Sequence, residues 1–196
     1  AELTKLRQIC CDPHLHYADY KAGSAKLDTC MELVHGALDG GHRILLFSQF
    51  TGMLDIIGKR LAKEDIVFLK LTGASSKESR AKMVAQFQAG EVPVFLISLK
   101  AGGVGLNLTA ADVVIHYDPW WNVAAQDQAT DRAHRIGQQH TVTVYKLIAK
   151  DTIEERIMQM QESKRDLVNS VLGGDGISSA LFTREDVLAL LGGDGR

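Results

Sequence analysis

The segment QATDRAHRIGQ, from Gln128 to Gln138, sets two arginines three positions apart, one helical turn beyond a glutamine. Helical residues at i, i+4 and i+7 share a face, so Gln128, Arg132 and Arg135 are predicted to form one polar stripe. Two guanidinium groups on one stripe present rigid forks of donors that suit a phosphate. Asp131 lies four positions before Arg135, so an internal salt bridge on a solvated face is the alternative.

A glycine-rich loop, SLKAGGVGLN from Ser98 to Asn107, follows an apolar run. Glycines let backbone N–H groups approach a phosphate without obstruction by side chains. The loop is neither a G-x-G-x-x-G dinucleotide fingerprint nor a G-x-x-x-x-G-K-[ST] P-loop. A glycine turn packed against a helix therefore remains an alternative to a ligand-binding loop.

Two adjacent tryptophans stand in the segment YDPWWN, which begins at Tyr117. Tryptophan is usually buried, and both rings can belong to the core. Consecutive residues point in different directions, however, so at least one of Trp120 and Trp121 is predicted to be partly exposed. An exposed ring at the end of a strand is suited to stacking against a base or sugar.

The elements that position these stretches alternate between strands and helices. Apolar runs predict strands, and amphipathic runs with capping boxes at Ser75–Glu78 and Thr152–Glu155 predict helices. This order is typical of an α/β domain, with five or six mostly parallel strands between two layers of helices. The predicted strands are 44–47, 67–71, 92–98, 113–117 and 142–148, and the predicted helices are 3–10, with Leu3, Leu6 and Ile9 on one face, 25–39, 51–61, 75–88, 123–135 and 152–172.

Composition narrows the classes of function. The 196 residues suit one domain, or one domain with an appendage, and the net charge of -2 argues against nucleic-acid binding through bulk charge. Cys10, Cys11, His14 and His16 match no standard zinc spacing, so no metal site is predicted. No apolar run is long enough to cross a membrane.

Taken together, the motifs resemble the second RecA-like lobe of a SWI/SNF-type ATPase, a family of superfamily-two helicase-like motors. The resemblance runs from residue 3 to about residue 172. The SLK variant at 98–100 and the PWW variant at 119–121 are similar to those of bacterial members. It is carried by RILLFSQF at 43–50, LTG at 71–73, FLISLKAGGVGLNLTAAD at 95–112, DPWWN at 118–122 and QATDRAHRIGQ at 128–138, with LRQICCDP at 6–13 and TIEE at 152–155 in flanking segments.

The resemblance implies a role for each matching residue. Arg132 and Arg135 correspond to arginine fingers that stabilise charge on the γ-phosphate of ATP, and Gln128 helps to place them. Trp121 corresponds to a tryptophan that touches the tracked DNA strand. Gly103, Gly105 and Asn107 belong to the motif that links the ATP and DNA sites, and Ser48, Gln49, Thr72, Gly73, Ser98 and Lys100 fall in motifs that touch DNA phosphates.

The resemblance also implies partners. Mg²⁺ and ATP would be held mainly by the family's first RecA-like lobe, because the Walker A lysine and Walker B acid are not in this sequence. We therefore expect the chain alone to hold no cofactor and to be inactive. Double-stranded DNA and the first lobe are the implied partners, with DNA-bound proteins such as RNA polymerase as further candidates, in the cytoplasm and nucleoid, or in the nucleus if the source is eukaryotic.

The expected organisation has four parts. Residues 1–22 form a linker helix and loop from the first lobe, 23–150 the second RecA-like lobe, 151–172 a long brace helix, and 173–196 a flexible tail with a possible short helix. Three positions depart from the family pattern: Lys100 replaces a common arginine, Val123 a proline and Asp12 a histidine. The alternatives are a non-catalytic lobe that binds DNA or protein, and a free-standing α/β enzyme for a ligand such as a nucleotide sugar.

Overall fold

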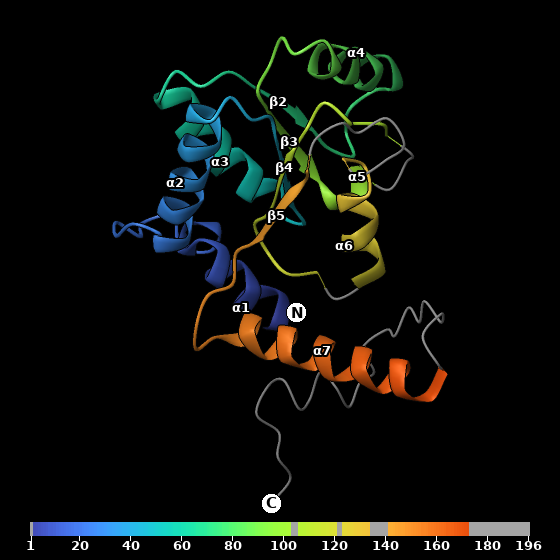
Figure 1. The fold of residues 1–196 in the computed structure, drawn as a ribbon. Coiled ribbons are helices and arrows are strands. Elements are labelled where there is room, and N and C mark those ends of the chain that lie inside the picture. Colours follow the sequence, from blue (N-terminus) through green and yellow to red (C-terminus); the bar gives the residue numbers. More distant parts are fainter. Residues whose placement is uncertain (1, 103–105, 121–122, 134–140, 173–196) are drawn as a thin grey trace, which may run out of the picture.

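Five parallel strands form the centre of the computed structural model, which describes residues 2–102, 106–120, 123–133 and 141–172 (Figure 1). The strand order is β2-β3-β1-β4-β5, and every neighbouring pair is parallel. The strands are β1 Ile44–Ser48, β2 Phe68–Leu71, β3 Val94–Ser98, β4 Val113–His116 and β5 Thr143–Lys146.

Helices cover both faces of the sheet, which confirms the predicted three-layer αβα fold (Figure 1). Helices α2 and α3 lie on one face, and α4, α5 and α6 lie on the other. The helices are α1 Glu2–Cys11, the 3-10 turn η1 Pro13–Leu15, α2 Ala25–Asp39, α3 Thr51–Lys63, α4 Lys77–Gln88, α5 Leu99–Gly102, α6 Val123–Thr130 and α7 Ile153–Leu172.

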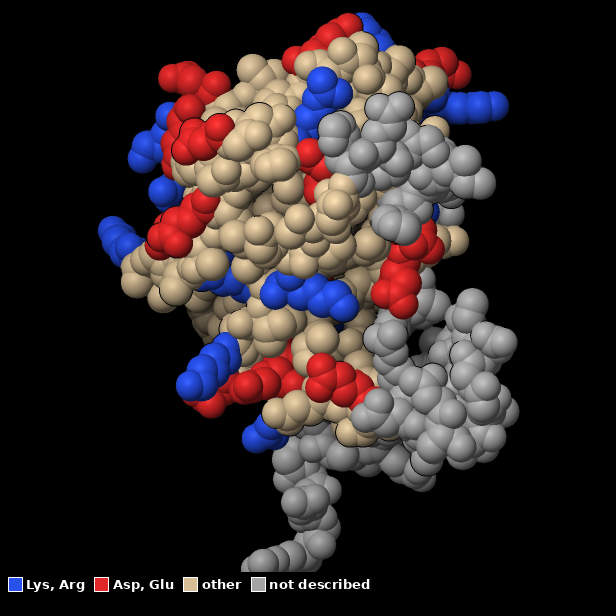
Figure 2. All heavy atoms as spheres, viewed as in Figure 1, with Lys and Arg blue, Asp and Glu red and all other residues tan. Residues whose placement is uncertain are grey.

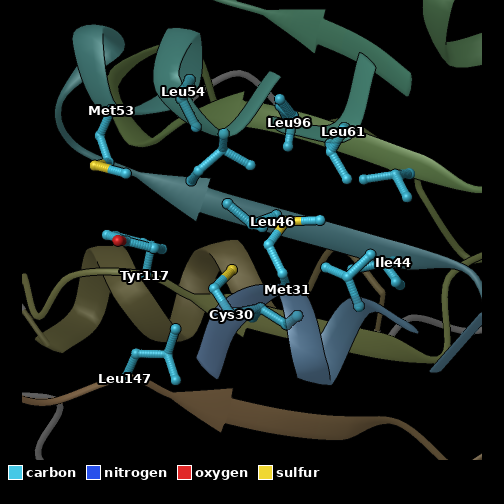
Figure 3. Close-up of a cluster of buried hydrophobic side chains, with 14 of the residues drawn as sticks. Cys30, Met31, Ile44, Leu46, Met53, Leu54, Leu61, Leu96, Tyr117 and Leu147 are labelled. Carbon is cyan, nitrogen blue, oxygen red and sulfur yellow. The ribbon is translucent and has the colours of Figure 1, made fainter. Parts of the chain in front are cut away.

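Alternate side chains of each central strand enter two separate cores, as the pleat of a strand requires. Ile44 and Leu46 of β1 lie beside Cys30 and Met31 of α2 (Figure 3). Leu45 and the other residues that point away from α2 pack with Phe87 of α4 and with the alanines of α5 and α6. All five residues of β1 and of β3 are buried, which explains their continuous apolar runs.

Helix α1, predicted from the helical spacing of Leu3, Leu6 and Ile9, turns a charged side chain inward. Leu6 is 42% exposed, whereas Arg7 and Cys11 are buried. The guanidinium group of Arg7 has its own hydrogen-bond partners inside the molecule, so the helix turns the arginine inward. Helix α1 also packs against α7 (Figure 1).

Serine and threonine side chains cap the first turns of α4 and α7. The N-cap of α4 is Ser76, whose hydroxyl accepts from the N–H of Ser79, and not the predicted Ser75. The Ser75 hydroxyl instead accepts from the N–H of Thr72 in the preceding turn. At α7 the predicted Thr152 cap holds, because its hydroxyl accepts from the N–H of Glu154. The Glu155 carboxylate accepts from the N–H of Asp151, one residue before the position that a capping box requires.

Candidate nucleotide- and DNA-binding edge

Most of the predicted site residues follow the carboxyl ends of strands. Because all five strands are parallel, these ends meet at one edge of the sheet, where ligands bind in open α/β sheets. Ser48 and Ser98 are direct partners in neighbouring strands. Thr72 and Gly73 follow β2, Lys100 follows β3, and the segment that contains the tryptophans follows β4.

Ser48 and Gln49 surround a buried carboxylate at this edge. Asp118, only 1% exposed, accepts from the Ser48 hydroxyl at 2.5 Å and from the Gln49 N–H at 3.3 Å. Burial raises the pKa of Asp118, while the Ser48 hydrogen bond and the charge of Arg7 oppose that rise. The Ser48 hydroxyl is thus committed inside the protein, and its predicted contact with a DNA phosphate stays a prediction.

Arg7 extends this network to helix α1. Its Nη1 donates to Oε1 of Gln49 at 2.9 Å, and its Nη2 donates to the Pro119 carbonyl at 2.5 Å. The side chain is almost completely buried, and desolvation lowers the pKa of its guanidinium. Gln49 is only partly exposed and is engaged by Arg7, so its predicted DNA contact also stays a prediction.

The turn after β4 carries Asp118, Pro119 and Trp120. Trp120 is partly exposed, as expected for at least one of the two tryptophans, and Trp121 lies outside the described residues. The Trp120 N–H donates to Oε1 of Gln126 on α6 at 3.4 Å, and its carbonyl accepts from the side-chain amide of Gln161 on α7. The turn is therefore hydrogen-bonded to helix α6, which follows it in the sequence, and to the more distant helix α7.

The glycine loop begins with the short helix α5. The Ser98 hydroxyl accepts from the N–H of Ala101 at 3.3 Å, and its side chain is buried. Lys100 and Asn107 are exposed, so both are available to a ligand at this edge. Gly103 and Gly105 lie outside the described residues. Thr72 is partly exposed and Gly73 exposed in the turn after β2.

The arginine segment does not continue as one helix. Helix α6 ends at Thr130, and the N–H groups of Arg132 and Ala133 bond to carbonyls three residues back, at 3.4 and 3.0 Å. The expected continuous stripe is therefore wrong at Arg132: Gln128 is exposed, whereas Arg132 is only 2% exposed. The tighter turn directs Arg132 into the interior, and Arg135 lies outside the described residues.

Hydrogen bonds from two backbone N–H groups join the three motifs. The N–H of Leu108, which follows the glycine loop, donates to the Arg132 carbonyl at 3.1 Å. In the first half of α6, Oε1 of Gln126 accepts from the N–H of Trp120. Helix α6 and the residues that follow it thus link the glycine loop, the tryptophan turn and the arginine segment.

The surface charges of the face shown in Figure 2 are mixed, as the net charge of -2 leads one to expect. Figure 2 shows acidic and basic side chains interspersed over the described surface of one face, rather than gathered in one basic band. Any phosphate contact on this face would therefore come from a few local groups. Within the described residues no three His, Cys, Asp or Glu side chains are grouped as metal ligands, and none of the described helices is long and apolar enough to cross a membrane.

Three contributors to this edge, Arg7, Asp118 and Gln161, were not among the predicted site residues. Arg7 and Asp118 stand inside the flanking and tryptophan motifs, but no pattern distinguished them from surface charges. Gln161 is one of several polar residues in helix α7, and the sequence holds no signal for its contact with Trp120.

Similarity to known proteins agrees with this geometry. Residues 25–137 match the helicase conserved C-terminal domain family. The C-terminal domain of a Sulfolobus solfataricus SWI2/SNF2 ATPase is 36% identical, with a TM-score of 0.71 over 91% of this chain and 72% of that one. The chain therefore belongs to the helicase conserved C-terminal domain family, as the C-terminal lobe of a SWI2/SNF2-type ATPase.

Two further relatives are much longer than this chain. An uncharacterized ATP-dependent helicase of Mycoplasma pneumoniae is 43% identical over 189 residues, which are 96% of this chain and 18% of the relative. The Sulfolobus solfataricus SWI2/SNF2 ATPase core in complex with double-stranded DNA is 39% identical, with a TM-score of 0.73 over 87% of this chain and 36% of that one. The chain thus spans about a fifth of the first relative and about a third of the second.

Proposed function

We propose that this chain is the C-terminal motor lobe of an ATP-dependent double-stranded DNA translocase. The carrying observation is that α6 and its continuation connect the glycine loop, the tryptophan turn and the arginine segment through the Leu108–Arg132 and Trp120–Gln126 hydrogen bonds. A motor needs its ATP-sensing and DNA-contacting groups to move together, and hydrogen bonds to one element provide that connection.

In this proposal the side chains of this lobe act on ATP that is bound to another lobe of the same protein. ATP and Mg²⁺ would bind mainly to a first RecA-like lobe, and the γ-phosphate would face Arg135, Arg132 and Gln128 across the cleft. Bound ATP supplies the phosphate that attracts the two arginines. Arg132 is buried, so its contact with that phosphate requires its side chain to leave the interior when the lobes close.

The DNA contacts proposed for this lobe come from the same edge. Lys100, Gly73 and Asn107 are exposed there, and a few such groups suffice to contact one strand's phosphates locally. We propose that Trp121 touches the tracked strand. The double-stranded DNA bound to the Sulfolobus relative supports this assignment of the partner. Closure around ATP and release after hydrolysis would then step these contacts along the strand.

The alternative is a lobe that binds DNA or protein without a part in catalysis. The burial of Arg132 favours it, since a buried arginine contacts no phosphate in this conformation. The two functions differ in what Arg135 does, because only a catalytic lobe requires an arginine there for turnover.

The test is DNA-stimulated ATP hydrolysis by the full-length protein that contains this chain. Arg132→Ala and Arg135→Ala are expected to lower turnover by about 10³-fold, as loss of an arginine finger does. Arg60→Ala is the matched control, because Arg60 lies on α3 and pairs with Asp28 and Glu64. Near-normal turnover of Arg135→Ala would reject the catalytic assignment.

A further inference from the structure

Two helices outside the layers that cover the sheet donate hydrogen bonds to consecutive carbonyls of the tryptophan turn. Arg7 of α1 donates to the Pro119 carbonyl at 2.5 Å, and Gln161 of α7 donates to the Trp120 carbonyl. The first and the last helix of the described chain therefore each donate one hydrogen bond to this turn. Trp121, the residue proposed to touch DNA, comes next in the sequence.

Both donors are built into the interior rather than resting on the surface. Arg7 is 3% exposed and Gln161 8% exposed. Arg7 is also held from two sides, by Oε1 of Gln49 at 2.9 Å and by the ring of Phe50, whose centre lies 5.7 Å from its guanidinium carbon. A buried side chain with several fixed contacts has little freedom, so each donor defines a place for its carbonyl.

The turn depends on these donors because most of it is buried: Asp118 and Pro119 are buried and Trp120 is half-buried. Asp118 lies inside, bonded to Ser48 and Gln49, and the charge of Arg7 favours its ionised form. A buried carbonyl that loses its donor pays the cost of desolvation without compensation. This conformation of the turn is therefore favoured when α1 and α7 are both docked.

We propose that Arg7 and Gln161 are positioning residues for the DNA-contacting turn, and that docking of α1 and α7 fixes the Pro119 and Trp120 carbonyls. The proposal rests on the function proposed above. Helix α1 would lead in from the first lobe, so a movement of that lobe would reach the turn through Arg7. The DNA contact would then depend on a helix that touches neither ATP nor DNA.

The test compares variants of the full-length protein by the DNA concentration that gives half-maximal ATPase stimulation. Arg7→Ala and Gln161→Ala are expected to raise that concentration about tenfold, which corresponds to a loss of about 1.4 kcal/mol of DNA-binding free energy. Turnover without DNA should stay within about twofold, since neither residue touches the nucleotide. Arg7→Lys, which keeps the positive charge but only one donor nitrogen, should recover part of the loss.

Matched control variants separate a specific effect on the DNA-contacting turn from a general loss of folding or activity. Arg60→Ala removes a partly exposed arginine of α3, and Gln159→Ala removes an exposed glutamine two residues from Gln161. Both should leave the DNA concentration for half-maximal stimulation unchanged. An equal effect of the controls, or a loss of basal and stimulated turnover together, would overturn the proposal.

Hydrogen exchange provides a readout that does not depend on DNA. Peptides that cover 117–123 should exchange faster in Arg7→Ala and Gln161→Ala, while peptides from β1 and β3 keep their protection. If wild-type ATPase is not stimulated by DNA, the proposed function fails and the DNA role of these residues fails with it. Unchanged exchange in 117–123 would instead reject the positioning role alone.

Discussion

Removal of Lys26 should destabilise the chain much more than removal of another lysine with an equally short ion pair. Lys26 of α2 contacts both carboxylate oxygens of Glu154, at 2.7 and 2.5 Å, and the two side chains are 8% and 0% exposed. Glu154 also accepts from the N–H of Ala149, just before α7. The pair thus joins α2 to the start of α7.

The magnitude follows from the buried carboxylate that Lys26→Met would leave behind. Breaking a buried ion pair from one side costs about 3–5 kcal/mol. Glu154 can take up a proton instead, which from its reference pKa of 4.5 costs about 1.36 × (7 − 4.5), or about 3.4 kcal/mol, at pH 7. We therefore expect a loss of about 3 kcal/mol of unfolding free energy at neutral pH.

The pH dependence of this loss has a definite sign. Burial already raises the pKa of Glu154, and without Lys26 its pKa rises further. A raised folded-state pKa gives a stability contribution that is present below the unfolded pKa and is lost as pH rises through the folded pKa. The deficit of Lys26→Met relative to wild type should therefore shrink as pH falls from 7 toward about 4.5.

Urea unfolding followed by circular dichroism at pH 7.5 and pH 5 measures both effects. Lys70→Met is the control, because Lys70 lies 2.5 Å from Asp55 but the two side chains are 39% and 52% exposed. An exposed pair contributes about 1 kcal/mol or less. Glu154→Gln in the Lys26→Met background should restore stability. Equal losses for Lys26→Met and Lys70→Met, or a deficit that grows toward pH 5, would refute the reasoning.

Two further predictions concern the sheet and the helices around it. Burial lowers the pKa of His116 to about 4, so unfolding free energy should fall by up to about 1.4 kcal/mol per pH unit from pH 6.5 toward 4. His116→Gln should remove this component of the slope in urea titrations, and an unchanged slope would contradict it. Gly36→Ala should raise unfolding free energy by about 0.5–1 kcal/mol, since a Cβ there meets no atom within 4 Å on the exposed face of α2. Gly58→Ala should gain less in thermal melts, because its Cβ would lie 3.0 Å from the Phe68 ring, and an equal gain would contradict the packing argument.

The fold was predictable because its signals are local. Continuous apolar runs gave the buried strands β1 and β3, and helical spacing with a following Gly40 gave α2 at its observed bounds. The choice between Ser75 and Ser76 as the cap of α4 was not predictable. Both hydroxyls are suitable acceptors, and the turn that engages Ser75 decides between them.

The candidate site was predictable as motifs but not as geometry. Spacing placed Gln128 and Arg132 on one helical face, on the assumption that the helix continues to residue 135. The helix ends at Thr130, where bonds to carbonyls three residues back and the contact with Leu108 turn Arg132 inward. Arg7 was missed for a related reason: apolar spacing assigns the inner face of a helix, and a buried arginine is determined by distant partners.

We propose that this lobe belongs to a motor that moves along double-stranded DNA. Displacement of a third strand from a DNA triplex by the full-length protein measures that movement directly. We expect release that requires ATP hydrolysis in the wild type and in Arg60→Ala, and no release in Arg135→Ala, which should still bind DNA. Normal release by Arg135→Ala, or hydrolysis by the wild type without release, would contradict the account.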